Sequence, residues 1–460
     1  MANTQSGIQS AEDFQLRNVK IYSDRFPNKF IDITQLVAEI NIFEQLNTLY
    51  LTGNITFLDD QNVFNIIDIQ GTEIVEIELK LPDKEVSTIS KRFVILNTQK
   101  TIKMNDHSTI INLSLREARG YYNDLLKFSK AYDGSGESII QKIIEDKLKS
   151  NIYNFDWKTS GPIQFNRSYQ KLFRYIVPYI TPMDAIKKVL SKMTTKYGLP
   201  YFCSAALLTD DFLLTDLESI LASDSFNSTP FTYSQDLTQA PNIGAQAFSI
   251  QKIKSNTSED TLLAAQLGSI GLSYSITELK TGKSTDTHLS MRDIFDRYLE
   301  LGILNRTDQY FIDNLFQPKK LIEDSITDSF ADSLTDYDSR RFYQISANTY
   351  EEDVFNFTEE TDIADYFLRA VSAALKRHLL NNTHTITLPG LLFLNPNAVN
   401  TSVGYKINLK TFKTNRSDGP DMKRSGDFII LAKRHIFNCS SFKHKVILDV
   451  GRISKPQDQN

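Results

Sequence analysis

Apolar and polar residues alternate with a period of two in two widely separated stretches of the chain. Residues 93–96 (Phe-Val-Ile-Leu) and 428–431 (Phe-Ile-Ile-Leu) each open an apolar strand. Turns are expected around Asn105-Asp106 and Ser440-Ser441. The return strands then alternate in the same way, through Ile111, Leu113 and Leu115 in one and Val446, Leu448 and Val450 in the other. The two stretches align without a gap over about 25 residues, at an offset of about 335. We therefore predict that one β module occurs twice.

A further pair of strands precedes each stretch. The pattern predicts strands at 49–58 and 74–81 before the first copy, and at 385–394 and 405–412 before the second. Within 74–81, Val75, Ile77 and Leu79 alternate with Glu76, Glu78 and Lys80, which is typical of one buried face and one wet, charged face. Because identity between the copies is low, a common sandwich pattern shared by chance is the alternative to duplication.

Helical periodicity replaces the strand pattern between residues 118 and 235. The Asp133–Glu137 turn leads into a helix whose apolar face is Ile139, Ile140, Ile143, Ile144 and Leu148. A second helix begins at Thr181-Pro182-Met183-Asp184, where Thr181 can cap and Pro182 suits the first helical position. Its buried stripe is Ala185, Ile186, Val189, Leu190 and Met193, and Gly198 is expected to end it. Strands at 201–207 and 212–216 complete a small α+β domain.

Strands resume at 247–253 and 272–279, and an acidic segment follows. Residues 291–365 carry 18 acidic and 7 basic side chains, and we interpret them as a partly helical insertion (helix 293–302) with a polar stretch at 325–339. A helix at about 361–380 then leads into the second β module. The expected fold is α+β and β-rich. Its expected domains are a first β-barrel or sandwich (1–117), an α+β middle domain (118–235), a second β domain (236–290 plus 366–460) and the acidic insertion (291–365).

Composition narrows the functional classes. The 460 residues exceed what one core holds, and a formal charge of −5 disfavours a dedicated nucleic-acid binder. Cys203 and Cys439 fit buried, inert thiols in a reduced compartment. Residues 1–15 lack the layout of a signal peptide, and no apolar run reaches the ~20 residues of a membrane span. We expect a soluble protein made in the cytoplasm.

Catalytic constellations are missing from the sequence, and we assign no catalytic, cofactor-binding or metal residues. Six scattered histidines lack metal-ligand spacing: His107, His288, His378, His384, His435 and His444. His378 is expected to pack or to meet a helix C-terminus, and His435 and His444 fall on opposite arms of the final hairpin, where two histidines alone make a weak metal site. Gly134-Ser135-Gly136 lacks nucleophile-elbow spacing. Paired acids such as Asp59-Asp60 and Asp210-Asp211 are typical of solvated surface.

At this point the chain resembles a known family, the central baseplate hub proteins of contractile-tailed bacteriophages and related injection machines. Seven stretches carry the resemblance: 51–60, 69–78, 181–186, 201–202, 216–219, 426–431 and 434–437. Together they touch every expected domain except the acidic insertion, and none of them is a catalytic signature.

The resemblance implies a structural virion protein of the tail baseplate, assembled in the host cytoplasm. It implies a homotrimer whose two tail-tube-like β domains per chain build a ring of six modules. Such a hub adapts the sixfold tail tube to the threefold spike and forms part of the channel for DNA ejection. The implied partners are the spike protein, tail tube or tube-initiator proteins, the tape measure protein and baseplate wedge proteins, with DNA only in transit.

Two further hypotheses stand beside the hub. One is a receptor-binding or other interaction module of the tail without ring symmetry, which the many tyrosines would serve. The other is a tail-associated cell-wall hydrolase that uses acids of the insertion. Within the hub hypothesis, we expect the wet faces with Glu76 and Glu78, and with Asn408 and Lys410 in the second copy, to line the channel with an acidic bias or else to form outer surface.

Overall fold

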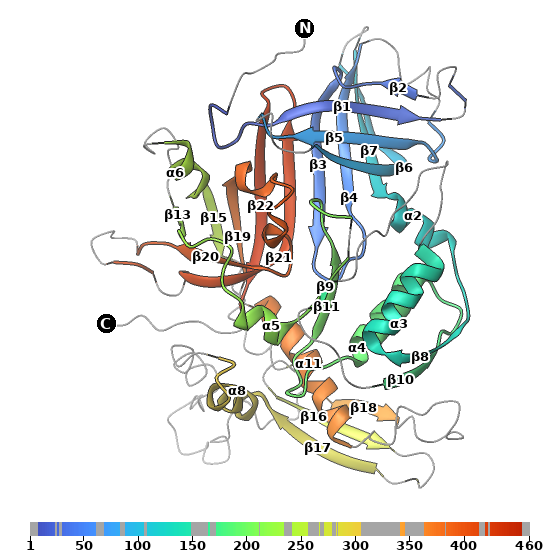
Figure 1. Ribbon diagram of the computed structural model, residues 1–460, viewed down its shortest axis with the longest axis vertical. Helices are drawn as coiled ribbons and strands as arrows, with labels where there is room; N and C mark the ends of the chain where they lie inside the picture. Colours follow the sequence, from blue (N-terminus) through green and yellow to red (C-terminus); the bar gives the residue numbers. More distant parts are fainter. Residues whose placement is uncertain are drawn as a thin grey trace, which may run out of the picture.

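The fold is known from a computed structural model of the chain (Figure 1). It describes residues 8–452 except 24, 27–29, 61–68, 83–87, 105–107, 149–163, 166–171, 211, 234–241, 256–265, 267–270, 278–281, 283, 305–340, 346–362, 382, 414–418 and 422–423. The turn expected at Asn105-Asp106, His107 and the polar stretch 325–339 lie outside the described residues. The expectation of a β-rich α+β fold is confirmed.

The first 117 residues form strands, as the alternating pattern predicts. These are β1 (Gln15–Tyr22), β2 (Phe30–Asp32), β3 (Val37–Gln45), β4 (Thr52–Asp59), β5 (Ile74–Lys80), β6 (Ile89–Lys103) and β7 (Thr109–Glu117). One long sheet contains them in the order β3-β4-β7-β6-β5-β1-β2. The core on one side of it includes Ile40, Ile42, Ile55, Ile77 and Phe93.

Residues 118–222 fold into the helical middle part of the chain. Its elements are α2 (Ala118–Leu125), β8 (Ala131–Ser135), α3 (Gly136–Ile143), a π-helical turn (Ile144–Leu148), β9 (Gln164–Phe165), β10 (Leu172–Ile176), α4 (Pro182–Lys192), β11 (Tyr201–Ala205), β12 (Phe212–Asp216) and α5 (Leu217–Ala222). The cap of α4 is confirmed, since the Thr181 side chain accepts from the Asp184 N–H. Two details were wrong: α4 ends at Lys192 rather than near Gly198, and Asp133 and Gly134 lie in strand β8, which pairs with β10.

The second half of the chain returns to the long sheet. Its elements there are β13 (Phe231–Tyr233), α6 (Ile243–Ala247), β14 (Ser249–Ile250), β15 (Lys252–Ser255), β19 (Thr383–Pro389), β20 (Lys406–Lys410), β21 (Gly426–Asn438) and β22 (Lys443–Gly451), with short 3₁₀ turns at Leu391–Phe393 and Val399–Thr401. A separate three-stranded sheet holds β16 (Gly271–Thr277), β17 (Ser284–Ser290) and β18 (Arg341–Ile345). Helices α8 (Met291–Glu300) and α11 (Ile363–Asn381) pack beside it.

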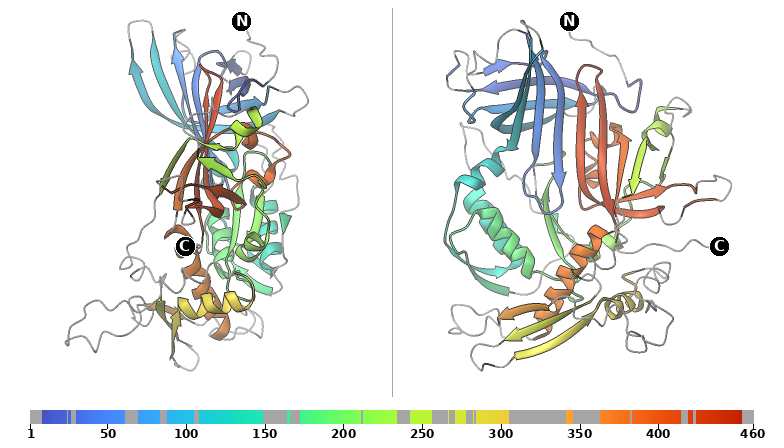
Figure 2. Two further views of the ribbon diagram at one scale, coloured as in Figure 1. Left: turned by 90° about the vertical axis from the view of Figure 1, so that its left-hand side faces the viewer. Right: turned by 180° about the vertical axis from the view of Figure 1, so that it is seen from behind.

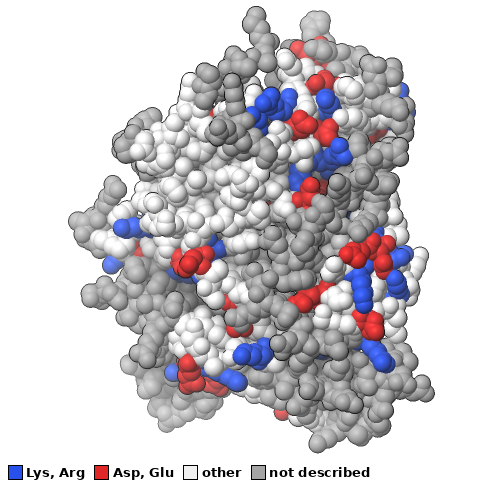
Figure 3. Space-filling view, in the orientation of Figure 1, with Lys and Arg blue, Asp and Glu red and all other residues white. Residues whose placement is uncertain are grey.

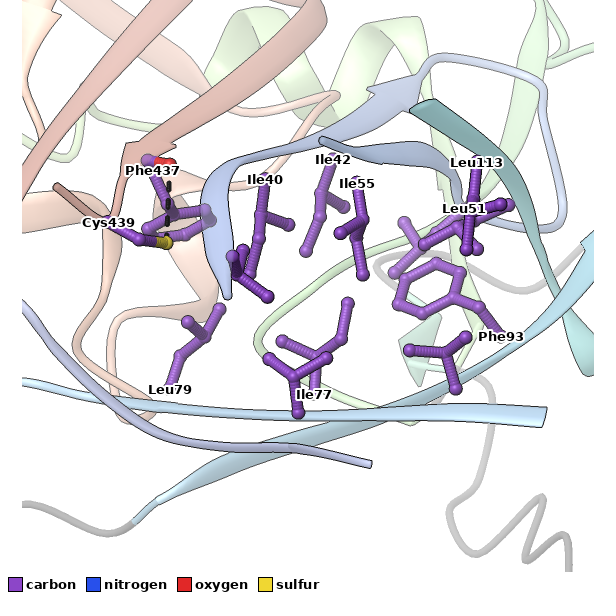
Figure 4. Close-up of a cluster of buried hydrophobic side chains, with 14 of the residues drawn as sticks. Ile40, Ile42, Leu51, Ile55, Ile77, Leu79, Phe93, Leu113, Phe437 and Cys439 are labelled. Atoms are coloured by element: carbon purple, nitrogen blue, oxygen red, sulfur yellow. Dashed lines mark hydrogen bonds between the residues drawn. The ribbon is translucent and has the colours of Figure 1, made fainter. Parts of the chain in front are cut away.

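The two halves of the long sheet meet directly. Strand β21 of the C-terminal half pairs with β3 of the N-terminal half, so the chain builds one continuous sheet (Figure 1). Seen from behind, the long strands lie side by side in front, while the helical part lies to one side and below (Figure 2). In the core close-up, Phe437 and Cys439 from the β21 end lie beside Ile40 from β3 (Figure 4). The second half thus completes the core of the first.

Among the described helices, none is long and apolar enough to cross a membrane.

Candidate assembly interface

The two predicted hairpins have the same backbone register. In β6–β7, Ile95 pairs with Leu115, and in β21–β22, Ile430 pairs with Val450. Both pairs of equivalent residues are 335 positions apart. A β-bulge follows at the same place in each hairpin, between Ile95 and Asn97 in the first and between Ile430 and Ala432 in the second. Bulges are designed features rather than defects, so a shared bulge is strong support for a true repeat.

The alignment is not free of gaps, contrary to the expectation from sequence. A second bulge between Thr98 and Lys100 has no counterpart in β21. It adds one residue to β6, so Ile102 of β6 corresponds to Ile436 of β21. This one-residue insertion keeps the same side chains facing the core, because the extra residue is absorbed in the bulge.

The strands that flank each hairpin are repeated as well. Strand β4 pairs with β7 as β19 pairs with β22, and β5 pairs with β6 as β20 pairs with β21. Strand β3 pairs with β4 as β15 pairs with β19. We call β3-β4-β7-β6-β5 the first module and β15-β19-β22-β21-β20 the second module. Residues Glu76 and Asn408 occupy equivalent positions, as the sequence comparison predicted.

The junction between the modules is a pairing of strand edges. The first half of β21 pairs with β20, and its second half, from Ala432 to Asn438, pairs antiparallel with β3. Register pairs include Lys433 with Glu44, His435 with Ile42 and Ile436 with Asn41. The second half of β21 is thus a docking edge that holds the outer edge of β3.

Each partner of this junction has an equivalent elsewhere in the chain. The equivalent of the β21 docking edge is residues 97–102 of β6, and the equivalent of β3 is β15. Within the described residues, β7 is the strand partner recorded for residues 97–102, and β19 is the one recorded for β15. Asn97, Thr101, Lys252 and Lys254 are exposed, as is Ile102 at 37 %. Within the described residues, the chain therefore carries two open strand edges, β15 and the second half of β6, at opposite ends of an eight-strand run of the long sheet, β15-β19-β22-β21-β3-β4-β7-β6.

The two sides of this eight-stranded sheet differ in character. Residues directly opposite each other on paired strands share a face, and His435 pairs with both Ile42 and Val446. The hydrophobic clusters of both modules therefore lie on the same side, covered by β1, β2 and β5 in one and by β13, β14 and β20 in the other. The opposite side carries amides and hydroxyls, including the row Asn41, Asn54, Ser114 and Asn97.

Buried charges hold the junction together on the core side. Lys433 Nζ lies 2.9 Å from Glu44 Oε1, and both side chains are fully buried. His435 Nε2 lies 3.2 Å from the same oxygen, and His435 Nδ1 lies 3.0 Å from His444 Nε2. The Leu207 N–H also donates to Glu44, and Lys433 donates to the Thr401 carbonyl. This junction cluster therefore connects β3, β21 and β22 with the middle part of the chain.

The protonation states follow from these contacts. Burial alone would raise the pKa of Glu44, but Lys433 and His435 lower it to about 2. Burial, together with Lys433, lowers the pKa of His435 to about 4, and burial lowers that of His444 well below its ordinary value. Burial also lowers the pKa of Lys433, an effect that Glu44 opposes. At neutral pH an ionised Glu44 accepts from Lys433 and from the Nε2–H of a neutral His435, and His435 Nδ1 accepts from His444.

The chain's N-terminal end reinforces the second hairpin. Asp13 Oδ1 accepts from Lys443 Nζ at 2.7 Å, and Glu12 lies 3.5 Å from Lys445 Nζ. The Glu12 carbonyl accepts from the His444 N–H. Because these residues lead directly into β1, they tie the first module to the tip of the second a second time.

The residues singled out from sequence occupy structural positions. His378 lies in the last turn of α11 and contacts the ring of Phe295, as expected, and His384 packs on Phe428. His435 and His444 are cross-strand neighbours, with Glu44 as the group that sequence reasoning missed. Cys203 and Cys439 are buried, which raises the pKa of each thiol to about 12. Among the described residues, no group of three or more His, Cys, Asp and Glu side chains is placed to hold a metal ion.

The wet, charged face expected on residues 74–81 was wrong. Glu76 and Lys80 are buried, because β1 and β6 flank β5 on both sides and Glu76 receives Arg92 and the Tyr22 hydroxyl. Strand β5 covers the core side and lies outside the eight-stranded sheet. On the face that includes β1 and β5, Lys and Arg are interspersed with Asp and Glu among the described residues (Figure 3).

Comparison with known proteins gives a likeness in structure alone. No protein-family model and no curated protein matches the sequence. Solved structures that resemble it include a tail protein from Neisseria meningitidis (11 % identity, TM-score 0.47, covering 96 % of this chain and 97 % of that one) and a 43 kDa tail protein of prophage MuSo2 from Shewanella oneidensis (9 %, 0.48, 96 % and 98 %). A third is an E. coli type VI secretion component described as similar to T4 tail proteins gp27 and gp5 (9 %, 0.39, 97 % and 77 %).

These neighbours are phage tail and secretion-system proteins. They belong to the class that the sequence resemblance indicated. With identities near 10 % and TM-scores below 0.5, the likeness does not assign a function.

Proposed function

We propose that the chain is a structural tail protein, a baseplate hub that assembles into a closed ring through its two open strand edges. This proposal rests on the β21–β3 junction, where an edge strand of the second module pairs with an edge strand of the first. If residues 97–102 of one chain pair with β15 of a second chain in the same way, every junction in the ring joins equivalent strands. Such a head-to-tail contact closes into a ring when its rotation permits.

Three chains are the number that the family resemblance implies. Three chains would place six similar modules around one axis. The eight-strand runs of the three chains would together form one barrel. Barrels of 16 to 18 strands already leave an aqueous channel, so a barrel of this size encloses an open bore. A ring with threefold chemistry and approximately sixfold shape is what an adaptor between a sixfold tube and a threefold spike requires.

The polar side of the sheet would line the bore. The core side carries β1, β2, β5 and the second module's covering strands, and this bulk fits only on the outside of a narrow ring. The lining would then be rich in amides and hydroxyls such as those of Asn41, Asn54, Asn112 and Thr56. The same side also carries Arg434, Lys445, Lys252 and Lys254, so the lining would include cations beside the amides and hydroxyls. In this proposal the channel is lined by the side of the sheet that carries Asn41 and Asn54, and not by the face of Glu76.

This proposal assigns no catalytic role to the chain. The expected partners remain those of a hub: the spike on one side, tube or tube-initiator proteins on the other, the tape measure protein, and wedge proteins around the ring. The protein would reside in the virion tail, and the division into domains at residues 117, 235, 290 and 365 remains part of the proposal. The pairing of β18 with β16 favours grouping 271–290 with the acidic segment.

Disulfide trapping tests the proposed edge pairing. Ile436 and Asn41 are register partners within the chain, and their equivalents at the open edges are Ile102 and Lys254. The variant Ile102→Cys/Lys254→Cys is expected to form disulfides between chains and to run as a covalent trimer without reductant. The matched control Asn41→Cys/Ile436→Cys is expected to crosslink within one chain and to run as a monomer. A chain that crosslinks in the control but stays monomeric in the test pair would refute the ring.

A further inference from the structure

The two kinds of junction in the proposed ring differ in their buried chemistry. Within the chain, Lys433 and His435 of β21 face Glu44 of β3. The β6 positions equivalent to Lys433 and His435 are Thr98 and Thr101, as their pairing with Leu113 and Ile111 shows. Strand β15 is equivalent to residues 39–42 of β3, since Ser255 pairs with His384 as Ile42 pairs with Gly53. Glu44 follows Ile42 by two residues, and the residue that follows Ser255 by two in the sequence is Thr257, which lies outside the described residues. At the positions of Lys433, His435 and Glu44, the sequence of the open edges therefore has threonines.

Each docking edge could in principle accept either kind of strand. Strand β3 pairs with β4 as β15 pairs with β19, so backbone geometry alone does not decide whether β21 receives β3 or β15. Main-chain pairing gives affinity without choosing a partner, and side chains decide the choice. A chain with two modules therefore needs side-chain contacts that direct each strand to its own docking edge, so that modules do not exchange places and the ring closes.

We propose that the Glu44–Lys433–His435 cluster supplies these contacts, and that it reserves the β21 edge for a strand bearing Glu44. The inference rests on the proposed ring. If β15 docked on β21, Lys433 would be buried without a carboxylate. If β3 docked on β6, Glu44 would be buried opposite Thr98 without a cation. Removing one member of a buried ion pair is strongly unfavourable, and a single buried polar group that fixes register is the best-attested role of such pairs.

The hydrogen bonds of the cluster have one direction, which sharpens this selectivity. Glu44 Oε1 accepts from Lys433, from His435 Nε2–H and from the Leu207 N–H. His435 Nδ1 must then accept from His444 Nε2–H. A neutral residue in place of Glu44 would remove the shared acceptor from Lys433, His435 and Leu207 together, whereas an exposed ion pair would tolerate the loss.

A mispairing reporter tests the proposal. The pair Lys254→Cys/Ile436→Cys would crosslink only when β15 of one chain occupies the β21 edge of another. In the natural cluster we expect almost no crosslink from this pair. In the neutral background Glu44→Gln/Lys433→Met, we expect the crosslink between chains to rise at least fivefold.

Controls separate this inference from the ring itself. Circular dichroism and the within-chain crosslink of Asn41→Cys/Ile436→Cys report whether each background is folded. If the neutral background does not fold, Glu44→Thr/Lys433→Thr replaces it, since threonine occupies the equivalent β6 position. Mispairing that stays at the natural level in a folded neutral background overturns the proposal. Failure of the Ile102→Cys/Lys254→Cys crosslink in the natural background would instead refute the ring.

Discussion

Replacing Lys433 by Met should loosen the junction between the modules far more than an ordinary surface change. The side chain is fully buried 2.9 Å from Glu44, and its loss leaves a buried carboxylate with His435 and the Leu207 N–H as its remaining donors. Breaking a buried ion pair by removing one partner costs about 3 to 5 kcal/mol. Replacing both members together costs less, because no uncompensated charge remains.

Amide hydrogen exchange measures this effect where it acts. A loss of about 3 kcal/mol corresponds to a drop in protection of roughly 10²-fold, at 1.36 kcal/mol for each factor of ten. We expect this drop at the paired amides of β3 and the second half of β21. Amides of the α3 and α4 helices, which pack in a separate cluster, should change little.

The double variant decides whether the two charges are coupled. In Glu44→Gln/Lys433→Met, protection at the junction should be higher than in Lys433→Met alone. Additive losses from the two single changes would refute the reasoning, because residues in one buried network are expected to couple by about 0.5 to 3 kcal/mol.

Three further predictions concern single positions. Gly390→Ala should be strongly destabilising, because a Cβ there would lie 1.9 Å from His444 Nδ1, and thermal unfolding should show a lower midpoint unless His444→Ala is added. Stability should fall on acidification, because His435 stays neutral in the folded chain, with a pKa of about 4, whereas the unfolded chain takes up this proton below about pH 6.5. The stability that the neutral His435 contributes is complete above pH 7, and about 3 kcal/mol of it is lost by pH 4. The loss continues toward pH 2 because Glu44, whose pKa is about 2, then takes up a proton. Urea midpoints between pH 7.5 and 4 should therefore fall less in His435→Gln, and an unchanged profile would contradict the assignment. Thr181→Ala should cost about 1 kcal/mol by removing the cap of α4, whereas Thr181→Ser should cost little, and equal urea midpoints for both would contradict a capping role.

Local features were predictable from the sequence because their signals are local. Alternation identified β6, β7, β21 and β22, and the Thr181-Pro182 start located α4 to the residue. The repeat was visible because both hairpins keep their inward positions in the same phase. The rough correspondence of Glu76 with Asn408 was also predicted, although these residues are 332 positions apart rather than 335.

The junction was not predictable, because no local pattern says which strand edges meet. Strand β3 and the second half of β21 are separated by almost the whole chain, and their pairing follows from the packing of the two modules. One signal was available: Glu44 is in phase with the buried Ile40 and Ile42, and His435 with Phe437. Charged residues at inward positions indicate a buried pair, but sequence does not name the partner. The burial of Glu76 was missed for a related reason, since its partners Arg92 and Tyr22 come from neighbouring strands.

The particle formed by the purified chain tests the central claim most directly. Light scattering gives its mass, and class averages from electron microscopy give its symmetry. The account predicts a trimer of three 52.5 kDa chains, with a central opening and an approximately sixfold outline. A particle that remains a monomer or dimer at high concentration, or a trimer whose β modules do not form one closed ring, would contradict it.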